Sequence, residues 1–455
     1  MILGYPTKWV VNYRETTLDQ RSNVEMSQSL RRKHMKRRDF LKRSAVATGT
    51  MAAGIALADK VNPLEVHAEG IGTKVHKGKT IYDVVETNNE LKAYNETDTI
   101  FHRSGIWGFN HPEPVPPTFF MNMMSPKEHD NKGDGIIDFA LQQAAGINWG
   151  DKKQHYFLRP GKPNTIDGKA KAFKTPSEAS YYVKAAAKLY KASAVGICKY
   201  DENWMYAENI KEFAELGFKP KSVVVMAINM NHEILRLYPR PAGLAGAALG
   251  YSNMAEVSAK VAEFIAQLGY SSHAAGNHWG ISVPLAISAG LGEGSRMGTL
   301  LHPELGSGFR LCKVFTELEL EPDAPITFGV ENFCNNCKKC ADNCPSKAIS
   351  LAPKGYADGS NVSTRTGIKK WATDSVKCFE YWGESHADCG RCITSCPYFK
   401  YDNWVHRFAK IAVVTPGLQN VARYVDDLFG YGKMPTDALY DDVWDRLNKM
   451  TPERL

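Results

Sequence analysis

The sequence predicts a fold of the α/β or α+β class, followed by a small cysteine-rich domain near the C-terminus. Helix and strand patterns alternate between residues 136 and 310, and eight of the ten cysteines lie between Cys334 and Cys396. With 455 residues, 43% of them hydrophobic, the chain is long enough for about two or three globular domains. A core of that size needs no disulfide bonds to hold it.

The first 68 residues predict an export signal. A basic run, Lys36-Arg37-Arg38-Asp39-Phe40-Leu41-Lys42, precedes a weakly hydrophobic stretch from Ala45 to Ala58. The segment ends at Val66-His67-Ala68, which resembles a cleavage site with small residues. This order is typical of a twin-arginine signal peptide, which exports folded proteins. An ordinary amphipathic helix with a charged start is the alternative, and export would leave a mature protein that begins near Glu69.

The charge of the chain argues against a nucleic-acid partner. The formal net charge is +7, but residues 1–68 hold 12 Lys and Arg against 6 Asp and Glu, which leaves +1 for the rest. The positive charge therefore belongs to the leader, and a basic binding surface on the folded part loses its main support. No stretch has the roughly 18 apolar residues of a membrane span. The leader is long for its type, which makes Met26 and Met35 alternative start sites.

The mature chain divides into four segments by composition. Residues 69–135 are polar and rich in proline and aromatic residues, so we expect extended chain that wraps around a core. Residues 136–324 are expected to form that core, and residues 325–400 the cysteine-rich domain. A tail over residues 401–455, rich in Trp, Tyr and Asp, is expected to pack on the core.

Local patterns predict the elements of the core. Ile136–Ala145 and Ser177–Ala192 have helical patterns, whereas Ala194–Ile197 and Ser222–Ile228 have the composition of buried strands. Alternation of this kind favours a sheet that is covered by helices.

A further helix is predicted over Asn253–Leu268. Apolar residues recur there at spacings of three and four, Gly269 follows, and Asn253 with Glu256 resembles a capping box. This prediction places Tyr251 just before the helix, on a loop.

The cysteine spacing predicts two iron–sulfur clusters. The run Cys334-x2-Cys337-x2-Cys340-x3-Cys344-Pro345 matches the bacterial ferredoxin pattern, in which the fourth cysteine binds the other cluster. Cys378 and the run Cys389-x2-Cys392-x3-Cys396-Pro397 follow. Crossed ligation then gives one 4Fe-4S cluster on Cys334, Cys337, Cys340 and Cys396, and a second on Cys344, Cys378, Cys389 and Cys392.

Other uses of these cysteines fit the spacing less well. Structural zinc and disulfide bonds both occur with pairs of cysteines, but neither requires the repeated pattern with a following proline. Cys198 and Cys312 stand apart from the runs and are expected to be small buried residues. A domain of about 250 residues outside the clusters must hold whatever receives the electrons. The glycine-rich stretch from Gly290 to Gly294 lacks the spacing of a dinucleotide-binding loop and by itself favours a simple turn.

Taken together, the leader, the two cluster motifs and several short blocks resemble the catalytic subunits of respiratory reductive dehalogenases. These blocks are Tyr251-Ser252-Asn253-Met254-Ala255, Leu268-Gly269-Tyr270, Gly276-Asn277, Ala289-Gly290-Leu291-Gly292-Glu293, Arg296-Met297-Gly298 and Phe328-Gly329-Val330. The resemblance covers most of the chain after residue 69 and implies a nitroreductase-like α/β core that binds a corrinoid of the cobalamin type. The sequence lacks a D-x-H-x-x-G motif, so a histidine ligand to cobalt is not expected, in agreement with the base-off cofactor of the family.

The resemblance also assigns roles to single residues. It implies that Tyr251 donates a proton, with Asn277 and Arg310 as its partners, and Asn277 places the chain in the respiratory branch of the family. Cobalt reduced to Co(I) by the clusters would cleave the carbon–halogen bond. A tyrosine is a weak acid near neutral pH, and a nearby guanidinium favours its phenolate form.

Cofactor contacts are expected at Gly290, Gly292 and Trp382. The two glycines belong to one of the resembling blocks, and Trp382 lies between cluster ligands, although a packing role for it is nearly as well supported. His278 and Trp279, beside Asn277, are expected to form part of the wall of the site.

The expected function is anaerobic respiration with an organohalide as the terminal electron acceptor, at the outer face of the cytoplasmic membrane. The implied partners are a halogenated substrate, a small integral-membrane anchor subunit, a reduced electron carrier and the twin-arginine export machinery. No nucleic acid is expected, and a homodimer is left open. The alternatives are an enzyme resembling epoxyqueuosine reductase, against which the leader and the near-neutral mature charge argue, and an exported iron–sulfur electron-transfer protein.

Overall fold

The structure is a computed structural model that describes residues 76–105, 110–123, 132–146, 160–161, 163, 165, 168–399, 423, 427 and 432–450. The chain divides after residue 56, and every described residue belongs to the longer unit, Leu57–Leu455. The predicted leader over residues 1–68 and most of the predicted tail over 401–455 lie outside the described residues. In the described ranges, no helix combines the length and the apolar character needed to cross a membrane.

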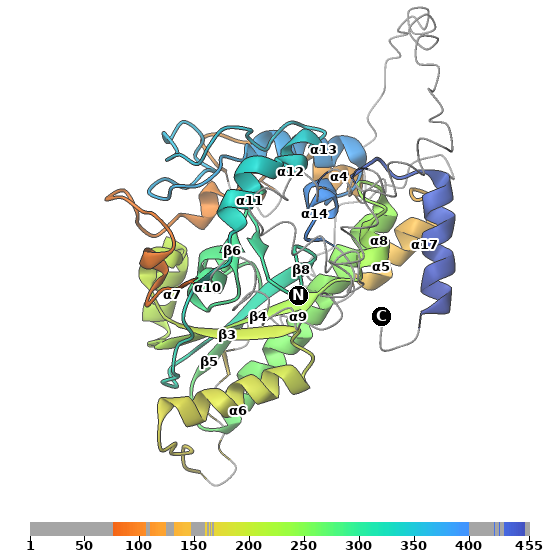
Figure 1. Ribbon diagram of the computed structural model, residues 1–455. Helices are drawn as coiled ribbons and strands as arrows, with labels where there is room; N and C mark the ends of the chain where they lie inside the picture. The colour runs from red at the N-terminus through yellow and green to blue at the C-terminus, as the bar shows by residue number, and fades with distance from the viewer. Residues whose placement is uncertain are drawn as a thin grey trace, which may run out of the picture. The chain divides into compact units, whose positions relative to one another are not determined.

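A five-stranded sheet organises the core (Figure 1). Its strand order is β2-β5-β8-β4-β3, and every neighbouring pair is antiparallel. The strands are β2 (Pro160–Gly161), β3 (Ala194–Lys199), β4 (Ser222–Asn229), β5 (Ser272–Ala275) and β8 (Phe309–Thr316). All residues of β4 but the last are buried, which explains its continuous apolar run. The two strands predicted from sequence are confirmed.

Helices cover both faces of this sheet, as predicted (Figure 1). Alternate residues of a strand point to opposite faces, so Val224 and Val314 pack with α6 (Pro176–Leu189) and α9 (Pro241–Gln267). Val223 and Phe315 pack instead with α7 (Ala207–Glu215) and α10 (Ser282–Ser288). The predicted helix Ile136–Ala145 is confirmed as α5, which packs against α9.

The helix predicted over Asn253–Leu268 is longer than expected. α9 begins at Pro241 and ends at Gln267, so Tyr251 lies in the interior of a helix and the prediction of a loop is wrong. The first ten residues of α9 are rich in alanine and glycine and are buried almost all round, so they show no amphipathic stripe. A Cβ on Gly250 would lie 3.0 Å from Met230 Cγ and 3.1 Å from Arg310 Cδ. This glycine therefore serves close packing and does not mark a helix end.

The described part of the N-terminal segment contacts both the core and the cysteine region. It contains β1 (His76–Lys77), the short 3-10 helices η1 (Ile81–Asp83) and η2 (Glu96–Asp98), α3 (Ile100–Arg103) and α4 (Thr118–Met123). β1 pairs with β9 (Ile326–Thr327), and Thr87 forms a bridge with Ile368. Tyr94 bridges to Tyr206 in the core.

The cysteine region is built from short helices around its own core. They are α11 (Val330–Cys337), α12 (Lys339–Asp342), α13 (Ser375–Ser385) and α14 (Arg391–Ser395). Seven of the eight clustered cysteines join aromatic residues such as Phe333 and Tyr398 in one hydrophobic core or pack against it. A hairpin of two short strands, β6 (Glu293–Gly294) and β7 (Leu300–Leu301), lies between this region and the sheet core. The remaining short helix of the sheet core is the 3-10 helix η4 (Glu202–Trp204).

One helix of the tail lies within the described residues. α17 (Asp437–Lys449) packs through Val443 against Ile234 of α8 (His232–Leu235) and Ala242 of α9. This part of the tail therefore packs on the core.

A buried histidine gives the core a predictable response to acid. His273 in β5 stacks on Trp279 with ring centroids 4.1 Å apart, and burial lowers its pKa to about 4. In the unfolded chain the His273 imidazole takes up a proton near pH 6.5, whereas in the folded protein it stays neutral until about pH 4. The free energy of unfolding therefore falls as the pH is lowered from 6.5 toward 4. We expect a loss of about 3 kcal/mol between pH 7 and pH 4 from this residue. Urea unfolding of His273→Leu should show a correspondingly smaller loss, and equal losses in both proteins would contradict the assignment.

Candidate active site and metal centres

Three residues predicted to act together meet in the structure. Tyr251 comes from α9, Asn277 from the loop after β5, and Arg310 from β8. Asn277 Nδ2 donates a hydrogen bond of 2.8 Å to the Tyr251 hydroxyl. The guanidinium carbon of Arg310 lies 3.5 Å from the centroid of the Tyr251 ring. A cation at that distance stabilises negative charge that develops on the phenol.

The loop that carries Asn277 is held from beneath by a buried lysine. Lys313 Nζ donates hydrogen bonds of 2.9 Å to the Gly280 carbonyl and to Ser282 Oγ. Burial lowers the pKa of Lys313 to about 7. Trp279 has a positive φ of 62°, which shows how tightly the loop turns. The sequence analysis missed Lys313, although a single lysine in the apolar strand Leu311–Phe315 is a visible signal.

Asp388 links the cysteine region to the same site. Its carboxylate accepts a hydrogen bond of 3.1 Å from the Tyr238 hydroxyl, and burial raises its pKa to about 7 although the Arg310 charge opposes this shift. Asp388 directly precedes Cys389, so one residue joins a predicted cluster ligand to the surroundings of Arg310. The sequence analysis missed Asp388, because no local pattern connects it to β8.

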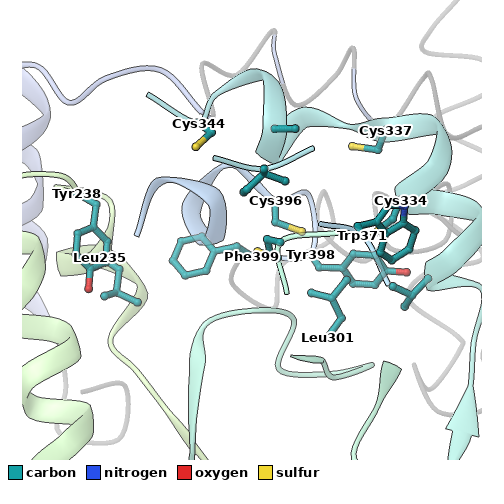
Figure 2. Close-up of a cluster of buried hydrophobic side chains, with 14 of the residues drawn as sticks. Leu235, Tyr238, Leu301, Cys334, Cys337, Cys344, Trp371, Cys396, Tyr398 and Phe399 are labelled. Carbon is teal, nitrogen blue, oxygen red and sulfur yellow. The ribbon is translucent and has the colours of Figure 1, made fainter. Parts of the chain in front are cut away.

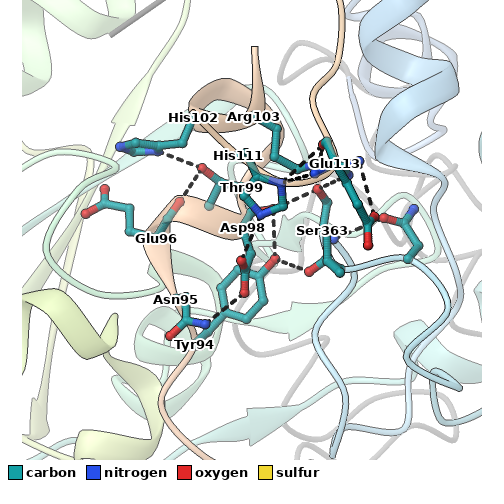
Figure 3. Close-up of polar contacts among 12 residues, drawn as sticks. Tyr94, Asn95, Glu96, Asp98, Thr99, His102, Arg103, His111, Glu113 and Ser363 are labelled. Atoms are coloured by element: carbon teal, nitrogen blue, oxygen red, sulfur yellow. Dashed lines mark hydrogen bonds and ion pairs between the residues drawn. The ribbon is translucent and has the colours of Figure 1, made fainter. Parts of the chain in front are cut away.

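A polar network in the N-terminal segment (Figure 3) contacts the loop that carries Asn277, through Glu96 and His278. His278 Nδ1 lies 2.6 Å from Glu96 Oε1, and the Glu96 backbone N–H donates to Glu208 Oε2. His102 Nδ1 lies 2.9 Å from Thr99 Oγ1, and burial lowers the pKa of His102. His278 and Trp279 were expected to be wall residues. His278 is half-exposed and contacts the Glu96 carboxylate, whereas Trp279 is buried.

A cavity of about 670 Å³ opens beside this network. Its walls come from the N-terminal segment, the start of α10, the β6 hairpin and the stretch between the two cysteine runs. Aromatic side chains line much of it, namely Tyr82, Tyr94, Trp204, Tyr206 and Trp371. Ile281 and Val283 in its wall follow Asn277 by only a few residues, so the cavity and the Tyr251 site share one loop. Its volume lies within the range of small-molecule and cofactor sites.

The eight clustered cysteines fall into two neighbouring sets of four. Cys396 lies within electrostatic range of Cys334, Cys337 and Cys340. Cys392 lies within the same range of Cys344 and Cys378, and Cys389 is a further neighbour of Cys378 and Cys392. Figure 2 shows Cys344 set apart from Cys334 and Cys337.

These sets have the membership that crossed ligation requires, and the assignment of the ligands stays a prediction. Cys340 is also a neighbour of Cys392, so the two sets adjoin, as electron transfer between clusters requires. Among the described residues, no three His, Cys, Asp or Glu side chains converge closely enough to hold a single metal ion.

The three predicted cofactor contacts, Gly290, Gly292 and Trp382, all have close packing neighbours within the protein. A Cβ on Gly290 would lie 2.5 Å from the Ala324 carbonyl oxygen, and one on Gly292 would lie 1.9 Å from that of Leu301. Because backbone atoms approach both positions so closely, packing alone explains why glycine occurs there. Trp382 on α13 contacts the rings of Phe119 and Phe101 at centroid distances of 5.1 and 6.0 Å. The cofactor role of all three stays a prediction.

Cys198 and Cys312 lie in the sheet core, fully buried and apart from the two sets of four. Burial raises the pKa of each thiol to about 12. Both therefore remain neutral and act as small apolar residues, as expected.

Comparison with protein families first defines the class of protein. Residues 333–399 match the family described as 4Fe-4S dicluster domain. The chain is therefore an iron–sulfur protein with a domain for two clusters, and the predicted ferredoxin-like region is confirmed.

Whole-chain relatives then define the family. The chain is 30% identical to the tetrachloroethene reductive dehalogenase of Sulfurospirillum multivorans over an alignment of 472 positions, which covers 90% of this chain and 93% of that protein. It is 37% identical to the tetrachloroethene reductive dehalogenase of Desulfitobacterium hafniense over 306 residues, which cover 57% of this chain and 55% of that protein. The match thus spans about half the length of the second relative. The protein belongs to the reductive dehalogenase family.

The fold agrees with this family. A solved reductive dehalogenase, described in terms of B12-dependent dehalogenation, superposes with a TM-score of 0.59 at 23% identity. The superposition covers 84% of this chain and 52% of that one. The predicted family resemblance and fold class are both confirmed.

Proposed function

We propose that this protein removes halide from an organohalide, using electrons that pass through two 4Fe-4S clusters to a bound corrinoid. The observation that carries the proposal is the meeting of Tyr251, Asn277 and Arg310, with the chain after Asn277 continuing into the wall of an aromatic cavity, in a member of the reductive dehalogenase family. The net reaction replaces a carbon–halogen bond with a carbon–hydrogen bond. It consumes two electrons and one proton and releases halide.

The residues of the chain fit the cofactors that this proposal requires. Two sets of four cysteines are available for two cubane clusters. The cavity, with its aromatic walls, lies between the sheet core and the cysteine region and is the candidate corrinoid site. When bound, the corrinoid supplies the cobalt chemistry that cleaves the carbon–halogen bond.

The protein's own residues supply the proton and control its position. The Tyr251 hydroxyl donates the proton to the carbon that loses halide, which leaves a phenolate. The Asn277 amide holds the phenol oxygen through its 2.8 Å hydrogen bond, and Arg310, stacked on the ring, stabilises the phenolate charge. Asn277 thus positions the acid, and Arg310 supplies a positive charge over its ring.

The proposal extends to localisation and partners. We expect twin-arginine export, with the mature protein attached to the outer face of the cytoplasmic membrane by a small integral anchor subunit. A reduced electron carrier would feed the clusters. The sequence of the leader and the near-neutral charge of the rest of the chain support this part of the proposal. Organohalide respiration, with the substrate as terminal electron acceptor, would be the physiological role.

The test begins with the composition of the anaerobically assembled protein. We expect about eight irons and about one cobalt per chain. With reduced viologen as donor, this protein should release halide from at least one compound in a panel of chloroethenes, chloroalkanes and chlorophenols. Full iron and turnover without cobalt would contradict the proposed chemistry. Full iron without cobalt or turnover would favour the electron-transfer alternative.

A further inference from the structure

The cavity is lined by two cationic side chains that form no ion pair with a carboxylate in the part of the chain that the structure describes. Four cations line it, but Lys354 pairs with Glu331 at 2.7 Å and Lys369 pairs with Glu86 at 2.8 Å. The remaining two are Arg365 and Lys370. Neither has an ion pair with a carboxylate among the described residues.

The other carboxylates near the cavity are already engaged. Asp83 accepts hydrogen bonds from the backbone N–H groups of Lys79 and Thr80, at 2.7 and 2.8 Å. Glu293 accepts from the backbone of Phe328 and Val330. Asp201, within electrostatic range of Arg365, accepts from the Tyr82 hydroxyl and the Asn203 backbone.

Arg365 is buried with unused hydrogen-bond donors. Only 8% of the residue is exposed, and its guanidinium stacks over Trp204 at 5.0 Å. Nη2 donates to the carbonyls of Lys92 and Asn203, but Nε and Nη1 have no hydrogen-bond partner among the described residues. Buried donors on a charged group are rarely left unpaired, since each one costs desolvation free energy.

Lys370 adds a second positive charge at the same place. Burial lowers the pKa of its ammonium, and the neighbouring Arg365 charge lowers it further, to about 8. At neutral pH the group is still mostly charged. An anion bound between two cations that repel each other in a partly desolvated cavity would stabilise the charge of both.

We infer that Lys370 and Arg365 form an anion subsite that holds the phosphodiester of a corrinoid's nucleotide tail. The inference rests on the proposed function, in which a corrinoid occupies this cavity. The phosphodiester is the one permanent anion of a complete corrinoid, and guanidinium and ammonium groups together suit its oxygens. The aromatic walls suit the apolar parts of the cofactor. Free phosphate carries the same chemistry, so the test must separate the two sources.

The experiment uses Lys370→Met, because Arg365 also holds two backbone carbonyls and its loss would disturb the fold. Anaerobic protein with both clusters is reconstituted with either a cobalamin-type corrinoid or a cobinamide, which lacks the nucleotide tail and its phosphodiester. Bound corrinoid is measured by absorbance and cobalt content, without any activity assay. We expect Lys370→Met to weaken cobalamin binding about 10- to 100-fold and cobinamide binding less than about 3-fold.

Two matched variants control for charge and fold. Lys369→Met removes the same charge from the next residue, which lines the cavity but is paired with Glu86, and should change neither affinity by more than about 3-fold. Lys370→Arg should restore most of the cobalamin affinity. If Lys370→Met weakens both corrinoids equally, or neither, the subsite is overturned.

The source of the phosphate is decided by adding inorganic phosphate to the cobinamide samples. If Lys370→Met weakens binding of free phosphate while the two corrinoids stay indistinguishable, the tail assignment is overturned. If the wild-type protein binds neither corrinoid, the proposed function itself is overturned. This outcome differs from failure of the subsite alone, in which the wild-type protein still binds both corrinoids.

Discussion

Replacing Tyr251 by phenylalanine is expected to lower dehalogenation by about 10²- to 10⁴-fold, the range in which a positioned general acid contributes. Phenylalanine keeps the ring on which Arg310 stacks at 3.5 Å but removes the hydroxyl that Asn277 holds. The proton donor is therefore lost while the packing of α9 remains. Initial rates of halide release under anaerobic conditions measure the effect.

The control for this variant is Tyr270→Phe. The Tyr270 hydroxyl donates to the Lys171 carbonyl at the surface, just after the same helix, so its loss should leave the rate within about 2-fold of wild type. Iron content, cobalt content and cluster spectra should be unchanged in both variants. Full activity of Tyr251→Phe would exclude the proton-donor role, whatever the state of the metals.

Paired cysteine substitutions are expected to show which thiolates share a cluster. If ligation is crossed, Cys334→Ser with Cys396→Ser damages a single cluster and leaves about four irons per chain. If each cysteine run holds its own cluster, the same double variant damages both and leaves almost none. The proximity of Cys396 to Cys334, Cys337 and Cys340 favours the first result. Dehalogenation should be lost in either case, because electrons must pass both clusters.

The reciprocal pair provides the internal check. Cys334→Ser with Cys344→Ser should remove both clusters under crossed ligation but only one if each run is independent. Cys312→Ala, a buried cysteine of the sheet core, should keep about eight irons. The crossed assignment would be contradicted if the Cys334→Ser, Cys344→Ser double variant kept about four irons and the Cys334→Ser, Cys396→Ser double variant kept almost none.

Local sequence signals predicted the elements that depend on local physics. The strand Ser222–Ile228 was visible because a strand buried on both faces is continuously apolar. The helix Ile136–Ala145 was predicted with both bounds correct. By contrast, the N-terminal half of α9 was missed, because an alanine- and glycine-rich helix buried on all sides has no amphipathic stripe to detect.

The candidate site shows the same division. The family resemblance selected Tyr251, Asn277 and Arg310, but it did not indicate how they meet. The structure shows a phenol held by an amide on one side and by a stacked guanidinium on its face. Asp388 and Lys370 had no local signal of function, because their significance comes from neighbours far away in sequence.

The sequence by itself determined the iron–sulfur chemistry and the family, since cluster ligands lie a few residues apart and their spacing is a property of the chain. Only the tertiary structure decided which charges remain uncompensated and which side chains share a cavity. Lys369 and Lys370 are adjacent in sequence, yet Lys369 is paired with Glu86, whereas Lys370 lies within electrostatic range of Arg365 and has no ion pair with a carboxylate in the described ranges. The physical reason is that desolvation and Coulomb energies depend on the three-dimensional surroundings of a charge, which only the folded chain creates.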